Sequence, residues 1–160
     1  MGLACCVLAA VPSTLFDLDR HAVPKELFLH LTALVAATAL LASADEVRLS
    51  KLDVALAAWL AVGAASALGA ENPWLAQRSL AINLSGVVIF WVSRTLARQG
   101  LSPRLTGAVA VATVVAAATA LAQAYGLDLP LFAETRVPGG TFGNRNFMAH
   151  LLSLGLPALL

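Results

Sequence analysis

Six stretches of this chain contain no Asp, Glu, Lys or Arg. They are residues 1–16, 27–44, 54–70, 79–93, 105–127 and 146–160. An α-helix needs about 20 residues, and at least about 17, to cross the roughly 30 Å of hydrocarbon in a bilayer. The fourth stretch can continue to residue 97, because arginine side chains at a helix end extend to the membrane surface. We therefore predict six membrane spans, the last incomplete, at about residues 2–16, 27–44, 54–70, 79–97, 105–127 and 146–160.

The composition indicates lipid as the surroundings of these helices. Hydrophobic residues make up 59% of the chain and charged residues 12%, whereas a soluble domain is about half apolar and about a quarter charged. Backbone groups in lipid must satisfy their own hydrogen bonds, and the sequence lacks the alternating pattern of a transmembrane β-barrel. The sequence predicts an all-α integral membrane protein, a multi-pass transmembrane helix bundle. A net charge of +1 gives no reason to expect a nucleic acid as partner.

Small residues in the predicted spans indicate close helix packing. In the fifth span they recur at every fourth position, at Ala108, Ala112, Ala116, Ala120 and Ala124. Such a face lets the backbones of two membrane helices approach closely, and we expect Val111 and Val115, outside the series, to face lipid. In the third span, Gly63 with Ala67 and Ala65 with Gly69 have the same spacing. An alanine-rich composition without a packing role is the alternative explanation.

The predicted loops carry charges that bear on orientation. The second and fourth loops contain five Lys or Arg residues, and the first, third and fifth loops also contain five. The fourth loop, residues 94–104, has three Arg and no acidic residue. Because positively charged loops stay in the cytoplasm, we predict a cytoplasmic N-terminus, with the odd-numbered loops in the periplasm.

The segment 134–150, between the fifth and sixth predicted spans, has the features most typical of a binding site. The Pro-Gly-Gly sequence at residues 138–140 predicts a turn. Gly143 allows the backbone to come close to another group. Either Asn144 or Asn146 can cap the helix that follows.

Two arginines, Arg136 and Arg145, flank the predicted start of that helix. Free N–H groups at a helix N-terminus attract anions, and a guanidinium group binds phosphate oxygens in a bidentate manner. We therefore expect a phosphate or pyrophosphate site formed by Arg136, Arg145, Asn144, Asn146 and Gly143. Ordinary turn residues with two interfacial arginine anchors are the alternative interpretation.

One short motif resembles a known family. The sequence Gly-Thr-Phe-Gly-Asn-Arg-Asn-Phe-Met-Ala-His-Leu-Leu at residues 140–152 resembles the loop-to-helix motif of the O-antigen ligase family, in which Gly-Thr-Phe-Gly-Asn-Pro-Asn leads into a membrane helix. Arg145 stands where that motif usually has proline. Residues 16–26 are similar to the first loop of many members. The resemblance covers these two stretches as motif and the rest of the chain only as a hydropathy pattern.

This resemblance implies a multi-pass transferase in the bacterial inner membrane. Its partners would be membrane lipid and an undecaprenyl-pyrophosphate-linked glycan, which it would transfer to lipid A core, a polysaccharide or a protein at the periplasmic face. The family implies no cofactor and no metal. It also implies that residues 1–160 are the N-terminal part of one transmembrane domain. The essential histidine of the family would lie beyond residue 160, so no catalytic residue is identified in this chain and the fragment alone should be inactive.

Other polar residues suggest less specific roles. Cys5 and Cys6 are adjacent in an apolar run and indicate neither a disulfide framework nor a metal site. His30 lies inside the second predicted span, where ionisable groups are candidates for function, but it is near the membrane surface, so a histidine that snorkels to that surface or bonds to a helix would also explain it. His150 follows Asn146 by about one turn and could face the same site, with a structural role as the alternative. The alternative function for the whole chain is a transporter or flippase for a lipid-linked or small substrate.

Overall fold

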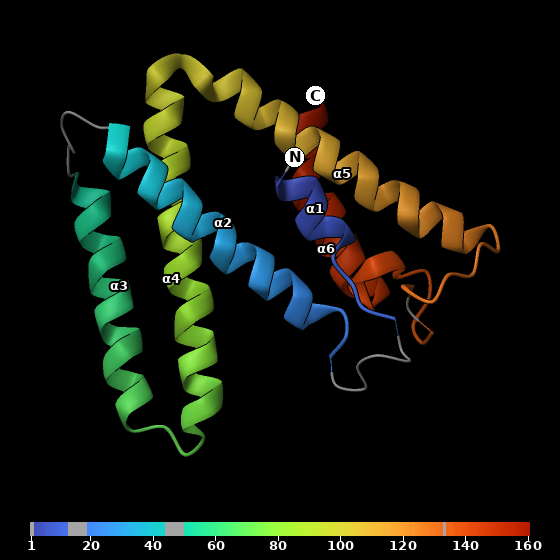
Figure 1. Ribbon diagram of the computed structural model, residues 1–160, viewed down its shortest axis with the longest axis horizontal. Coiled ribbons are helices and arrows are strands. Elements are labelled where there is room, and N and C mark those ends of the chain that lie inside the picture. The colour runs from blue at the N-terminus through green and yellow to red at the C-terminus, as the bar shows by residue number, and fades with distance from the viewer. Residues whose placement is uncertain (1, 13–18, 44–49, 133) are drawn as a thin grey trace. The chain divides into compact units, whose positions relative to one another are not determined.

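The computed structural model describes residues 2–12, 19–43, 50–132 and 134–160, and the regular structure in these ranges is entirely helical (Figure 1). The α-helices are α1 (Gly2–Leu8), α2 (Ala22–Ser43), α3 (Lys51–Leu68), α4 (Pro73–Leu96), α5 (Ser102–Ala124) and α6 (Arg145–Gly155). Shorter helical turns are η1 (Ala97–Leu101), η2 (Gly140–Phe142) and η3 (Leu156–Leu159). The predicted all-α class is therefore confirmed for the described residues.

Three helical stretches in the described residues are long and apolar enough to cross a membrane: Ala22–Ala42, Lys51–Leu68 and Pro73–Ala124. The third contains 52 residues, which at about 1.5 Å per residue exceeds twice the hydrocarbon thickness. Gly100 interrupts it, because its φ of 85° and ψ of 8° are not helical. The interruption separates α4, with 24 residues, from α5, with 23. Each of these two helices has about the length of a single crossing.

The helix at the start of the chain is shorter than predicted, whereas the last, incomplete span is helical over nearly all of its predicted range. The helix expected over residues 2–16 ends at Leu8 and contains 7 residues, or about 10 Å of helix. Pro12 lacks an amide hydrogen and disfavours helical geometry at Val11, and residues 13–16 of the expected span lie outside the described residues. In the sixth expected span, α6 contains 11 residues and is followed by η3. The described part of the first expected span therefore departs from the prediction, and the last span agrees with it.

The structure divides into two compact units, residues 1–28 with 100–160, and residues 29–99. The second unit contains the antiparallel pair α3 and α4 (Figure 1). Asn72 caps α4, since its side-chain oxygen accepts a hydrogen bond from Leu75 N at 3.1 Å, and Pro73 occupies the first turn, where no amide is needed. A Cβ at Gly63 would make an ordinary van der Waals contact with Leu80, and one at Gly69 would meet nothing within 4 Å, so of the two glycines expected to pack in the third predicted span only Gly63 adjoins a neighbouring helix.

The first unit is built around the alanine face of α5. Ala112, Ala116 and Ala120 are buried and pack with Val7 of α1 and Met148 of α6. The predicted packing face is thus confirmed at three positions, whereas Ala108 is half-buried and Ala124 is exposed. Side-chain size explains the use of alanine here, because a larger residue would separate α5 from both neighbours.

The contact between α5 and α6 is closest at Gly155. A Cβ atom at Gly155 would overlap the Thr113 side chain, and Thr113 is itself buried, with Oγ1 donating to Val109 O at 2.9 Å. This contact fixes the position of α6 along α5.

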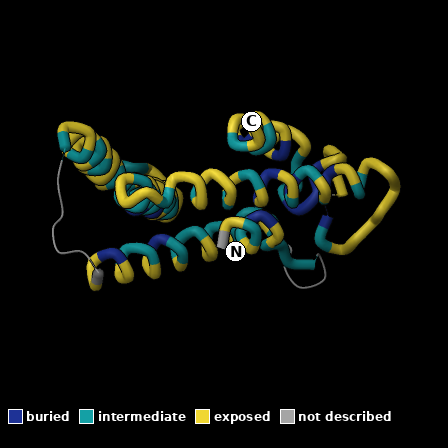
Figure 2. Tube along the Cα trace, turned by 90° about the horizontal axis from the view of Figure 1, so that it is seen from above, coloured by how far each residue is buried: buried dark blue, intermediate teal, exposed yellow. Residues whose placement is uncertain are grey.

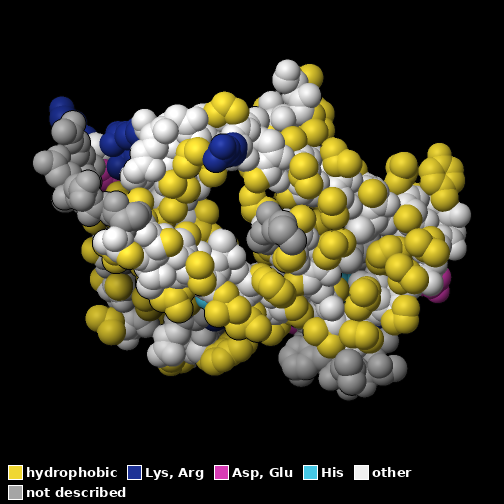
Figure 3. All heavy atoms as spheres, turned by 45° about the horizontal axis from the view of Figure 1, so that its top comes forward, with side chains coloured by type: hydrophobic (Ala, Val, Ile, Leu, Met, Phe, Trp, Pro, Cys, Tyr) yellow, Lys and Arg dark blue, Asp and Glu magenta, His cyan; other side chains and the backbone are white. Residues whose placement is uncertain are grey.

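Most of the remaining helical surface is apolar and exposed. None of the residues of α3 is buried, and Figure 2 shows how few buried residues the described helices contain. The face seen in Figure 3 is largely hydrophobic, with charged side chains at a few places. Exposed apolar patches larger than a few hundred Å² are rare on soluble monomers, so these surfaces fit contact with lipid or with other membrane helices.

Candidate functional site

The turn before α6, residues 139–143, has a backbone that favours glycine at two positions. Gly140 has a φ of 50° and Gly143 a φ of 70°, in the left-handed region that side chains disfavour. A Cβ at Gly140 would lie 2.5 Å from Thr119 Oγ1, and one at Gly143 would lie 2.5 Å from His21 Cδ2. The close backbone approach predicted at Gly143 is therefore present, and the group it approaches is the imidazole ring of His21.

The end of α5 holds the start of this turn. Gln123 Oε1 accepts hydrogen bonds from the backbone N–H groups of Gly139, at 2.9 Å, and Gly140, at 2.8 Å. One side-chain oxygen thus satisfies two consecutive amides that would otherwise lack partners in a tight turn. No local pattern in the sequence indicates this role, because Gln123 is 16 residues from Gly139.

Thr141 is the most heavily bonded residue of the turn. Its side chain is 2% exposed and donates through Oγ1 to Val7 O at 2.6 Å. Its carbonyl oxygen accepts from Lys25 Nζ at 2.8 Å and contacts His21 Nδ1 at 3.2 Å. Because a carbonyl only accepts, Nδ1 of His21 carries the hydrogen in this contact. Burial and the nearby Arg20 charge lower the pKa of His21, which favours the neutral ring.

Lys25 joins three separate segments at this turn. It lies in the first turns of α2, and its ammonium group donates to Ala9 O as well as to Thr141 O. The ammonium also lies 4.7 Å from the centroid of the Phe142 ring, a favourable position for a cation over an aromatic face. Lys25 therefore connects α2 to the chain after α1 and to η2, whereas its sequence position indicated only a charge near the first loop.

Arg20 joins the first and fifth loops. Its guanidinium group donates to Glu134 Oε1 at 2.8 Å, to Pro130 O at 2.9 Å and to Phe132 O at 3.2 Å. The Arg20 side chain is 12% exposed, but that of Glu134 is 69% exposed, so the ion pair itself adds little stability. These bonds and those of Lys25 bring the two loops together.

Asn144 caps α6. Its Oδ1 accepts from Asn146 N at 2.9 Å, and its carbonyl oxygen accepts from Met148 N at 3.1 Å. Of the two candidates for the cap, the structure therefore selects Asn144. The amide of Arg145 is also occupied, because it donates to Arg136 O at 3.0 Å. The expectation of several free amides at this helix start is corrected, since the amides of both Arg145 and Asn146 already have partners.

The expected site residues nevertheless lie together. The hydrogen bond from Arg145 N to Arg136 O brings the backbones of the two arginines side by side. Both residues are exposed, as is Asn146, whereas Gly143 and Asn144 are half-buried. Among the described residues, neither guanidinium group has an acidic or carbonyl partner, in contrast to Arg20. Two exposed and unpaired guanidinium groups at one turn are suited to binding a multivalent anion.

The remaining polar candidates have other positions. His30 Nδ1 lies 2.7 Å from Ser85 Oγ of α4, so His30 is bonded to a helix, one of the explanations that the sequence left open. His150 is exposed on α6. In the described parts of the chain, no three His, Cys, Asp or Glu side chains gather where they could hold a metal ion.

The sequence did not predict the buried ion pair near the C-terminal end of α4. Arg94 Nη2 contacts Asp53 Oδ1 at 2.6 Å and Oδ2 at 2.7 Å, and both side chains are largely buried. Ser50 completes the arrangement, because its backbone N–H donates to Asp53 Oδ2 at 2.6 Å. Arg94 is therefore bound to α3 and its charge is compensated, although its sequence position assigned it to the positive fourth loop.

Comparison of the chain with protein-family models, curated proteins and solved structures found no match.

Proposed function

We propose that this chain is the N-terminal part of a multi-pass inner-membrane glycan transferase similar to the O-antigen ligases. In this proposal α2, α3, α4 and α5 cross the membrane, and the turn before α6 binds the pyrophosphate of an undecaprenyl-linked glycan donor. The acceptor would be lipid A core, a polysaccharide or a protein. Each of these four helices contains 18 to 24 residues, about the length of one crossing.

The observation that carries this proposal is the pair of exposed guanidinium groups at Arg136 and Arg145. They lie at one turn, and their backbones are joined by the hydrogen bond from Arg145 N to Arg136 O. A pyrophosphate offers two phosphate groups, and each guanidinium group can bind phosphate oxygens in a bidentate manner. In the motif of residues 140–146, Arg145 also takes the place of the usual proline, so this chain has an additional cation there.

The way the turn is held supports a binding role. Bonds from Gln123, Lys25 and His21 hold the backbone of residues 139–141, which lie between the two arginines. A preformed site loses less conformational entropy on binding than a flexible one. Four crossings, an even number, would separate the first loop from the fifth, so both loops would lie at the same membrane face. The positively charged fourth loop would lie at the opposite, cytoplasmic face, which favours the periplasm for the first and fifth loops.

Arginine-to-lysine substitution tests the proposal, because lysine keeps the charge but loses the planar fork of donors. We expect Arg136→Lys or Arg145→Lys to weaken pyrophosphate binding to the chain in detergent micelles by roughly ten- to a hundredfold. Glycan transfer by the full-length protein should fall to a similar extent. Arg104→Lys is the matched control, since Arg104 is exposed at the opposite end of α5.

Two results would contradict this function. If both lysine variants keep full binding and full transfer across donor concentrations, the two arginines are interfacial anchors. If Arg104→Lys weakens binding as much as the other two variants, the effect reflects general charge rather than a site.

A further inference from the structure

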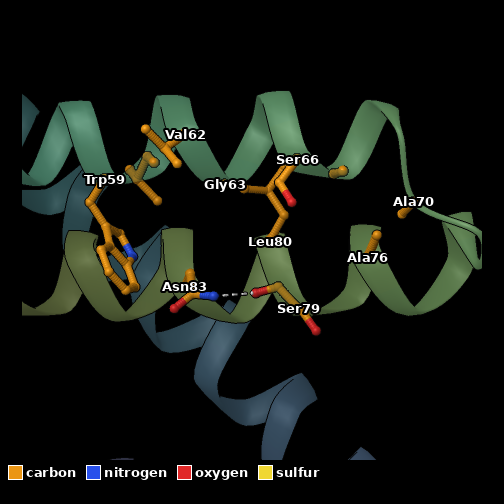
Figure 4. Close-up of a pocket in the computed structure, with 11 residues that line it drawn as sticks. Trp59, Val62, Gly63, Ser66, Ala70, Ala76, Ser79, Leu80 and Asn83 are labelled. Carbon is orange, nitrogen blue, oxygen red and sulfur yellow. Dashed lines mark hydrogen bonds between the residues drawn. The ribbon is translucent and has the colours of Figure 1, made fainter.

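The α3–α4 pair has an open groove. It has a volume of about 340 Å³ and is lined by residues of both helices, among them Gly63, Ser66, Ala76, Ser79 and Asn83 (Figure 4). Small side chains on both walls leave the two backbones accessible to an approaching helix. The rim is apolar, since Trp59 is 65% exposed and Val62 is 70% exposed.

Asn83 places an amide at this groove. It lies ten residues after Pro73, the first residue of α4, so it is about 15 Å along the helix and near the middle of a roughly 30 Å hydrocarbon layer. Its Nδ2 donates to Ser79 O at 2.9 Å. A carboxamide has a second N–H and an acceptor oxygen, and among the described residues neither of these has a partner.

The chemistry of this amide restricts what can cover the groove. A lipid acyl chain would fill it but would leave the amide oxygen and N–H of Asn83 without hydrogen bonds, which is costly in hydrocarbon. The occupant must therefore offer both a donor and an acceptor at the same depth. An identical carboxamide meets that requirement, because each amide donates to the oxygen of the other. In a two-fold symmetric contact, the same residue of each copy can lie near the axis.

We propose that this groove is a self-association surface on which a second copy of the chain docks, with the two Asn83 side chains hydrogen-bonded to each other. The small residues of α3 and α4 would then pack against the same helices of the other copy. This inference rests on the membrane insertion contained in the proposed function, but it does not depend on the transferase activity or on the pyrophosphate site.

The test is the association of the chain in liposomes, measured by energy transfer between labelled copies as the protein-to-lipid ratio is varied. We expect Asn83→Leu to weaken association by about tenfold, and Asn83→Gln, which restores a carboxamide, to recover part of the loss. Leu84→Ala is the matched control, since Leu84 is the next residue of α4 and is 51% exposed. Helix content by circular dichroism confirms that each variant is folded.

A disulfide trap adds a geometric test. In a background without Cys5 and Cys6, Asn83→Cys should form a covalent dimer on oxidation, and Leu84→Cys should not. The proposal is overturned if the chain stays monomeric at all protein-to-lipid ratios, or if Asn83→Leu associates as strongly as the parent. Alkaline extraction of membranes distinguishes the two proposals: a chain that is extracted contradicts membrane insertion, whereas a membrane-embedded monomer contradicts only this surface.

Discussion

Replacing Gly140 with alanine should strongly destabilise the first unit, because two independent effects combine at this position. The φ of 50° places an L-residue in the left-handed region, at a cost of about 1–2 kcal/mol. The new Cβ would lie 2.5 Å from Thr119 Oγ1 and 3.2 Å from Ala120 N. Thr119 cannot move without loss, since its Oγ1 donates to Ala116 O at 2.8 Å.

The expected magnitude follows from these terms. Overpacking in a well-packed region costs roughly 1–3 kcal/mol, and the reduced entropy of the unfolded chain returns about 0.4–1 kcal/mol. The net loss for Gly140→Ala is then about 2–4 kcal/mol. Alanine substitutions at two other glycines distinguish the cost of backbone strain from the cost of overpacking. Gly126 has a φ of 92° and open space within 4 Å of the position that a Cβ would take, and Gly107 lies in α5 with the same open space.

Denaturation in mixed detergent micelles, followed by far-ultraviolet circular dichroism, measures these differences. We expect Gly126→Ala to lose about 1 kcal/mol from backbone strain alone. Gly107→Ala should gain up to about 1 kcal/mol, because alanine favours the helix. The reasoning is refuted if Gly140→Ala loses no more stability than Gly126→Ala, since the contact with α5 would then contribute nothing.

Two further predictions concern α5 and the orientation of the chain. Ala116 is fully buried, so Ala116→Leu should lower the free energy of unfolding by roughly 1–3 kcal/mol. Val111 is 58% exposed, so Val111→Leu should change the stability little. Equal losses for both variants in the same denaturation assay would contradict the packing of this face. In a background without Cys5 and Cys6, a cysteine at Thr135 should react with a membrane-impermeant reagent added to the periplasm. Reaction only after the inner membrane is opened would reverse the proposed orientation.

The expectation that Val115 faces lipid is wrong. Val115, like Val111, lies outside the alanine series of α5, and the spacing alone therefore assigns both to the lipid side. In the structure Val115 is half-buried and packs against the cluster around Ala116. The cause is the presence of two neighbours, α1 and α6, which together cover a wider sector of α5 than a single helix would. Val111 is therefore the appropriate control, and Val115 is not.

The local features of the chain could be predicted from the sequence. The long charge-free runs at residues 27–44, 54–70, 79–93 and 105–127 predicted helices, which the structure shows as α2, α3, α4 and α5. The four-residue spacing predicted a face of five alanines, of which Ala112, Ala116 and Ala120 are buried. The sequence also limited the cap of α6 to Asn144 or Asn146. Each of these depends on residues within one or two helical turns, so the spacing in the sequence carries the necessary information.

The partners of the turn before α6 were decided only by the tertiary structure. Thr141 bonds to Val7, His21 and Lys25, which precede it by more than 100 residues. No periodicity encodes such a pairing, because it depends on how α1, α2 and α5 pack. The same packing explains why the Arg145 amide is already occupied by Arg136 O. Helix formation follows from local hydrogen bonding, whereas the groups left available to a ligand depend on which distant segments the folded chain brings together.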